Sequence, residues 1–156
     1  PYLEWARNGF IELTEGDVQD YDFIRKKIND LSLQYRIKSI AYDRWNASQL
    51  VIQLQDDGAN LSPFGMGYVS QSAPTKEMEK MVLKKLLVHG GNPVLRWQMQ
   101  NVQLKIDPAS NCKVDKAKSS EKVDGVISTI MSIGEWMLSD TKGSKTYFEH
   151  VDRTWI

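Results

Sequence analysis

Short apolar strands alternate with amphipathic helices over residues 10–90, and this alternation restricts the fold more than any other feature of the sequence. Over 17–37 apolar side chains recur every three or four residues, which predicts a helix with Asp17 or Asp20 as its N-cap. The full series reads as a strand or hairpin arm (9–16), a helix (17–37), a strand (38–43), a helix with Asn46 as N-cap (46–58) and a strand (62–72). Strands and helices in this order predict an α/β layer arrangement.

The second half of the chain adds helices and a hairpin. The predicted elements are a helix within 74–91, with Pro74 in its first turn and Gly90 after its end, a short helix (92–101), a hairpin (102–114) and a closing helix (119–138). The closing helix carries its apolar residues on one face: Val123, Val126, Ile127, Ile130 and Met131. We expect one domain over 1–138, followed by a tail, 139–156, whose aromatic side chains pack on the domain or on a neighbour.

Composition excludes several classes of protein. The chain has 156 residues, a formal net charge of zero and one cysteine, Cys112. One cysteine forms no internal disulfide and no thiolate zinc site, so a reducing cytoplasmic setting is expected. No apolar run approaches the ~20 residues of a membrane span. Residues 74–122 carry a net charge of +5, which suits a phosphate backbone and equally suits the solvated face of a Lys-rich helix.

Two acidic residues, at a strand end and at a helix start, are candidate metal ligands. Asp43 ends the apolar strand KSIAYD, at the edge where open α/β sheets present ligands, and Asn46 is the better cap for the next helix. Asp124 opens the last helix beside Gly125, a glycine that indicates close backbone approach. Two such carboxylates could hold a divalent metal that acts on a phosphodiester. The alternatives are an ordinary strand-end acid and an acid that complements the helix dipole.

Four stretches occur in an order typical of one family: AYDRWNASQLVIQLQDDG, SAPTKEMEK, LVHGGNPVLRWQMQNVQLKIDPASN and DKAKSSEKVDGVISTIMSIG. Over residues 1–138 the sequence resembles the C-terminal nuclease domain of the large terminase subunit of tailed double-stranded-DNA phages. The resemblance implies a ribonuclease-H-like fold, with a mixed sheet flanked by helices. It also implies an endonuclease that depends on Mg²⁺ or Mn²⁺ and cuts concatemeric DNA in an infected or prophage-bearing bacterial cell.

The family uses three clustered acids, and the resemblance places Asp43 and Asp124 on the second and third. The first belongs to a strand upstream of Pro1, so we expect an N-terminally truncated domain that is inactive or weak by itself. The family also implies an ATPase domain in the same protein, and a terminase small subunit and a portal protein as partners. An exposed sheet edge left by missing strands would favour self-association.

Four basic residues are candidates for contact with double-stranded DNA: Arg44, Lys116, Lys118 and Lys122. The three lysines fit a solvated loop equally well, and Arg44 fits an ion pair with Asp56 or Asp57. Two other functions compete with the nuclease. One is a non-catalytic DNA-binding or assembly module with a degenerate nuclease fold, and the other is an unrelated α/β binding protein.

Overall fold

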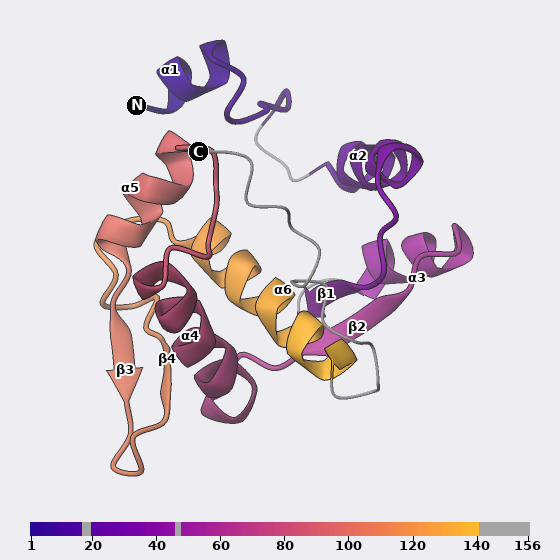
Figure 1. Ribbon diagram of the computed structural model, residues 1–156. Coiled ribbons are helices and arrows are strands. Elements are labelled where there is room, and N and C mark those ends of the chain that lie inside the picture. The colour runs from indigo at the N-terminus through magenta and orange to yellow at the C-terminus, as the bar shows by residue number, and fades with distance from the viewer. Residues whose placement is uncertain (17–19, 46–47, 141–156) are drawn as a thin grey trace.

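The computed structural model describes residues 1–16, 20–45 and 48–140, and the long helix α6 lies at the centre of this part of the chain (Figure 1). The elements in chain order are α1 (Tyr2–Arg7), α2 (Tyr21–Gln34), β1 (Ile40–Asp43), α3 (Ser48–Asp56), β2 (Leu61–Phe64), α4 (Tyr68–Leu83), α5 (Pro93–Asn101), β3 (Leu104–Ile106), β4 (Cys112–Val114) and α6 (Asp124–Asp140). The predicted α/β class is therefore confirmed.

The strands form two separate pairs. β1 and β2 run parallel, with Ile40 opposite Leu61 and Asp43 opposite Phe64, and α3 makes the crossover between them. β3 and β4 form the predicted antiparallel hairpin. The described residues thus contain two two-stranded sheets rather than the single mixed sheet that we expected. The two sheets lie on opposite sides of α6 and α4 in Figure 1.

The core forms where α6 packs against α4 and the two sheets. The face predicted for α6 is buried, and Ile130 is its most enclosed side chain, with 2% of its surface exposed. Met78 of α4 and Phe64 of β2 belong to the same cluster. Close packing is visible at Gly134 of α6, where a β-carbon would lie 2.8 Å from the Phe64 ring.

The predicted second strand is too long at its C-terminal end. β2 stops at Phe64, and residues 68–72 form the first turns of α4, so Pro74 lies inside this helix rather than in its first turn. Contacts with β4 explain the difference. Gln71 Oε1 accepts a hydrogen bond from the Val114 amide (2.9 Å), and the Ser72 hydroxyl oxygen accepts one from the Cys112 amide (3.2 Å). Both side chains are buried in this helical stretch.

The predicted strand or hairpin arm over 9–16 is also wrong. α1 precedes it and ends at Arg7. Gly9, with a positive φ of 74°, then turns the chain, and the residues that follow form bends and irregular structure. Trp5 anchors α1 by packing edge-on against Trp97 of α5, with ring centroids 5.3 Å apart. The N-terminal segment is therefore held by aromatic packing rather than by strand pairing.

Two helices differ from the expected bounds, because α4 ends early, at Leu83, and the closing helix begins late, at Asp124. Of the expected N-caps, one is confirmed and two are undescribed. Asp20 caps α2, where its carboxylate accepts a hydrogen bond from the Phe23 amide at 2.9 Å. The proposed caps Asp17 and Asn46, and residues 141–156 of the expected tail, lie outside the described residues. Within the described part of the chain, no helix is long and apolar enough to cross a membrane.

Candidate functional site

Asp43 is the last residue of β1 and is half-buried. Its Oδ1 accepts a hydrogen bond from the Trp45 amide (3.2 Å), which shapes the turn after the strand. Side chains alternate along a strand, and Ser39 and Ala41 both face α6, because Ser39 bonds to that helix and Ala41 packs on the core. Asp43 therefore lies on the α6 side of the sheet.

Asp124 is the first residue of α6, and its side chain is 65% exposed. Its Oδ1 accepts a hydrogen bond from the ammonium of Lys116 at 2.9 Å, which forms an ion pair between two exposed groups. Exposed ion pairs contribute little to stability, so a cation that binds Asp124 more strongly could displace Lys116. Lys116, predicted as a DNA contact, is thus placed beside a predicted metal ligand.

Gln98 of α5 supports the start of α6, and sequence reasoning missed it. Its Oε1 accepts hydrogen bonds from the amides of Gly125 (2.6 Å) and Val126 (3.3 Å), two of the donors that a helix N-terminus leaves unpaired. A β-carbon on Gly125 would lie 2.6 Å from the same oxygen. The close approach predicted from Gly125 is confirmed, and its partner is the Gln98 side chain.

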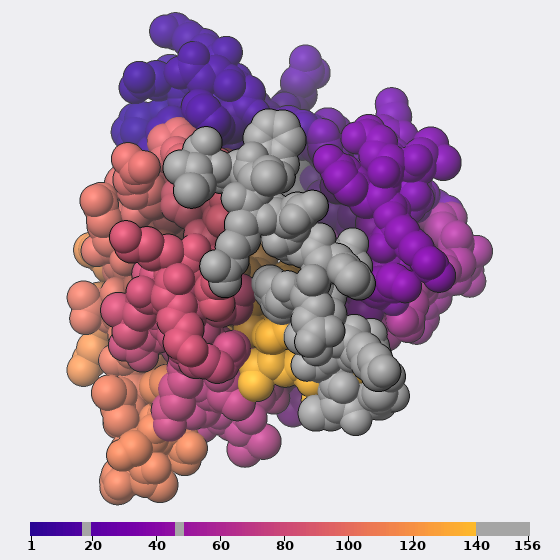
Figure 2. Space-filling model, in the orientation of Figure 1, coloured from indigo at the N-terminus to yellow at the C-terminus, as the bar shows by residue number. Residues whose placement is uncertain are grey.

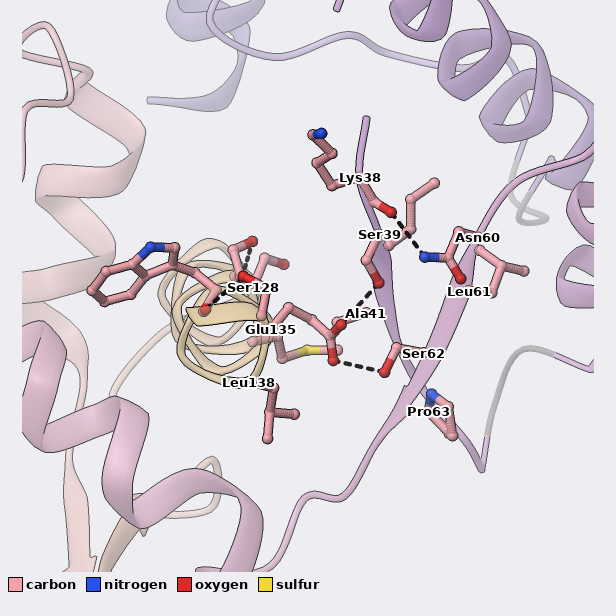
Figure 3. Close-up of a pocket in the computed structure, with 15 residues that line it drawn as sticks. Lys38, Ser39, Ala41, Asn60, Leu61, Ser62, Pro63, Ser128, Glu135 and Leu138 are labelled. Atoms are coloured by element: carbon pink, nitrogen blue, oxygen red, sulfur yellow. Dashed lines mark hydrogen bonds between the residues drawn. The ribbon is translucent and has the colours of Figure 1, made fainter. Parts of the chain in front are cut away.

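Glu135 fastens α6 to both strands of the parallel sheet. Its two carboxylate oxygens accept hydrogen bonds from the hydroxyls of Ser39 (2.8 Å) and Ser62 (2.7 Å), as Figure 3 shows. The carboxylate lines a cavity of about 740 Å³ between the sheet and α6. Glu135 therefore determines how the helix that carries Asp124 sits on the strand that carries Asp43.

The remaining basic candidates are exposed. Lys118 lies in a turn organised by the Asp115 carboxylate, which accepts a hydrogen bond from the Lys118 amide (3.3 Å), and Lys122 lies just before α6. Arg44 stacks over the Trp45 ring, with its guanidinium carbon 5.3 Å from the ring centroid. All three side chains are available to a phosphate backbone.

The alternative pairing of Arg44 is wrong, because no ion pair joins it to Asp56 or Asp57 among the described residues. Asp57 instead binds the guanidinium of Arg25 and the amide of Asn29, the latter at 2.8 Å. The hydrogen bonds from Arg25, followed by the one from Asn29, lower the pKa of Asp57 to about 2. This group of side chains ties α2 to the end of α3 and leaves Arg44 at the surface.

Carboxylate oxygens are the ligands that Mg²⁺ and Mn²⁺ prefer, and one or two of them, completed by water and substrate phosphate, are a common set for Mg²⁺. Asp43 and Asp124 fit this chemistry and stand on β1 and α6, which contact each other. No hydrogen bond joins the two among the described residues, and that part of the chain holds no group of three or more acids, histidines or cysteines suited to a metal.

Comparison with known proteins gives one consistent result. A family model described as "Terminase large subunit, endonuclease domain" matches residues 1–140. The large terminase subunit of Enterobacteria phage HK97 is 31% identical over 136 residues, which cover 86% of this chain and 27% of that protein. Protein YmfN of Escherichia coli is 26% identical over 153 residues, which cover 97% of this chain and 33% of the relative.

A solved structure agrees with these sequence matches. The crystal structure of the HK97 bacteriophage large terminase matches with a TM-score of 0.80 and 31% sequence identity, over 86% of this chain and 29% of that one. The chain therefore spans a third or less of the proteins that it matches.

Proposed function

Because the chain belongs to the family of terminase large-subunit endonuclease domains, we propose that it is the nuclease part of a phage DNA-packaging enzyme. In this proposal the fold is ribonuclease-H-like, and Asp43 and Asp124 supply two acids of a site that hydrolyses DNA phosphodiesters. The observation that carries it is the family match over 1–140, with both acids on elements that pack together.

A bound Mg²⁺ or Mn²⁺ would activate water and stabilise the leaving oxygen, with Asp43 and Asp124 as its carboxylate ligands. Lys116, which pairs with Asp124, would be released when a cation binds and would then contact a phosphate. Arg44, Lys118 and Lys122 would contact the DNA backbone, independently of base sequence.

We further propose that this chain by itself cleaves weakly or not at all. The family resemblance calls for three acids, and two carboxylates hold a metal pair poorly because the ligand shared by both ions is lacking. In the whole protein the domain would cut concatemeric DNA in the bacterial cytoplasm, together with a small subunit and a portal protein. Self-association through the edge of β1 that pairs with no described strand belongs to the same proposal.

Binding and cleavage test these statements separately. Titration of the chain with Mn²⁺ should show binding that Asp43→Asn and Asp124→Asn each weaken. Asp30→Asn, an exposed acid on α2, is the matched control and should change nothing. Equal affinity in all four proteins would remove the two acids from the site.

Plasmid cleavage tests the statement about activity. Incubation with Mn²⁺ should leave supercoiled plasmid largely intact. Robust cutting that Asp43→Ala abolishes would contradict the inactivity of the isolated chain while supporting the nuclease assignment.

DNA binding distinguishes the nuclease from a non-catalytic clamp. Reversing the charge of Lys116 and Lys118 should weaken binding to any duplex and lower its salt dependence. A chain that binds DNA through these lysines but binds no Mn²⁺ would instead be the non-catalytic module.

A further inference from the structure

A hollow of about 350 Å³ lies where the end of α4 meets α5, and its wall combines basic and apolar side chains. Lys85, His89 and Arg96 supply the basic groups. The rest of the lining is apolar: Val82, Leu87, Leu95 and Met99. Among the described residues no acid lines it, so the hollow presents positive charge around an apolar floor.

The positive charge is not neutralised locally. Residues 76–99 carry five lysines or arginines and two glutamates. One of these glutamates, Glu77, pairs with Lys80 on α4. Within the described part of the chain no ion pair engages Lys85 or Arg96, so both charges are available to a ligand.

The backbone at Lys85 is unusual for its residue type. Lys85 follows the C-cap of α4 at a φ of 57°, where its amide bonds to the Val82 carbonyl (3.0 Å) and the next amide bonds to the Met81 carbonyl (2.8 Å). Glycine is the usual residue at this position of a helix end, because a side chain is disfavoured there. α1 and α3 end in the same way with Gly9 and Gly58.

The lysine therefore occupies a position that the other two helix ends give to glycine, and its side chain lines the hollow. A lysine near a helix C-terminus also complements the helix dipole, but Lys84 already stands one residue earlier. Lys85 keeps an unfavourable backbone conformation beside a hollow large enough for a ligand. This indicates that its side chain has a role in binding.

Exposed apolar side chains surround the hollow. Leu83 is 76% exposed and Val88 is 87% exposed, and Leu86 between them is also exposed. The segment that joins α4 to α5 lies on the face shown in Figure 2. Gathered apolar side chains mark protein–protein contacts, whereas nucleic-acid interfaces are more polar. The surface thus favours a polypeptide over a DNA backbone.

We propose that this basic–apolar hollow is a docking site for an acidic amphipathic segment of a partner protein. Carboxylates of the segment pair with Lys85 and Arg96, and its apolar side chains enter the floor beside Met99. The site is separate from Asp43 and Asp124, so it does not depend on the nuclease assignment.

The test measures binding of a short labelled peptide of alternating Glu and Leu by fluorescence anisotropy. Arg96→Glu should weaken binding about tenfold or more, because it replaces attraction by repulsion. Lys105→Glu, on the exposed hairpin strand β3, is the matched control and should leave the affinity unchanged. Met99→Ser should weaken binding by removing part of the apolar floor.

Lys85→Gly separates docking from folding. Glycine relieves the backbone, so this variant should unfold at a higher urea concentration, yet bind the peptide about fivefold more weakly. Peptide binding equal to that of the unsubstituted chain would overturn the proposal. So would a labelled DNA duplex that binds through Lys85 and Arg96 while the peptide does not, since the hollow would then be a phosphate contact.

Discussion

Glu135 offers the most direct test of how the two candidate acids are held. Its carboxylate accepts one hydrogen bond from Ser39, just before β1, and one from Ser62 in β2. Glu135→Ala removes both bonds and leaves two half-buried hydroxyls without their acceptor. Glu135→Gln keeps the shape and still offers one acceptor and one donor to the two serines.

The cost follows from the number and kind of bonds lost. Hydrogen bonds to a charged group contribute about 1.5–3 kcal/mol each, and partial solvent access at Glu135 favours the lower figure. Glu135→Ala should therefore lower the free energy of unfolding by about 3 kcal/mol, or about 6–12 °C in Tm for a domain of this size. Glu135→Gln should lose about 1 kcal/mol.

Urea unfolding followed by tryptophan fluorescence measures these differences, with Glu79→Ala on the exposed face of α4 as the control. Combining Glu135→Ala with Ser39→Ala and Ser62→Ala should cost clearly less than the sum of the separate changes, since they remove the same bonds. Strict additivity, or a loss in Glu135→Ala no larger than in the control, would show that the carboxylate does not fasten α6 to the sheet.

Three further predictions follow from other contacts. Gly134→Ala should lower the free energy of unfolding by about 1–2 kcal/mol in urea, because the new methyl group meets the buried Phe64 ring. Hydrogen bonds from Arg25 lower the pKa of Asp57 to about 2, so the ionised carboxylate stabilises the folded state. This stabilisation is complete above the ordinary carboxyl pKa and is lost as pH falls toward about 2. In Arg25→Gln the free energy of unfolding should therefore change less between about pH 4 and pH 2. Lys116→Gln frees the first carboxylate of α6 and should raise Mn²⁺ affinity about twofold to fivefold by calorimetry, whereas an unchanged affinity would contradict competition between the two cations.

Local signals were sufficient where one element determines its own conformation. The helical spacing of apolar residues in α6 can be read within one stretch of sequence. The Asp20 carboxylate that caps α2 bonds to an amide only three residues away. The start of α4 is missed because Tyr68 and Val69 favour strands. The contacts that hold this stretch as a helix come from β4, 40 and 43 residues later in the chain. Distant hydrogen bonds of this kind leave no periodic trace in the sequence.

The candidate site shows the same division. Asp43 and Asp124 are predicted from their positions at the ends of elements, and their role in a metal site stays a prediction. Gln98 and Glu135, which position α6, bond to groups 27 and 96 residues away and carry no local signal of that role. Gly125 was the one indirect clue, because glycine in a helix indicates a close neighbour without identifying it.

The bonds made by Glu135 also bear on the order of folding. β1 and β2 can pair once α3 has formed between them. The helix that covers them, α6, comes much later: its Glu135 lies 96 residues after Ser39 and 73 residues after Ser62. Closing loops of that length is entropically unfavourable until α4 and the hairpin have already shortened the distance. During synthesis the parallel pair therefore waits, with one face open, until α6 has left the ribosome. We expect premature stops before α6 to expose this face to aggregation rather than to yield a smaller stable domain.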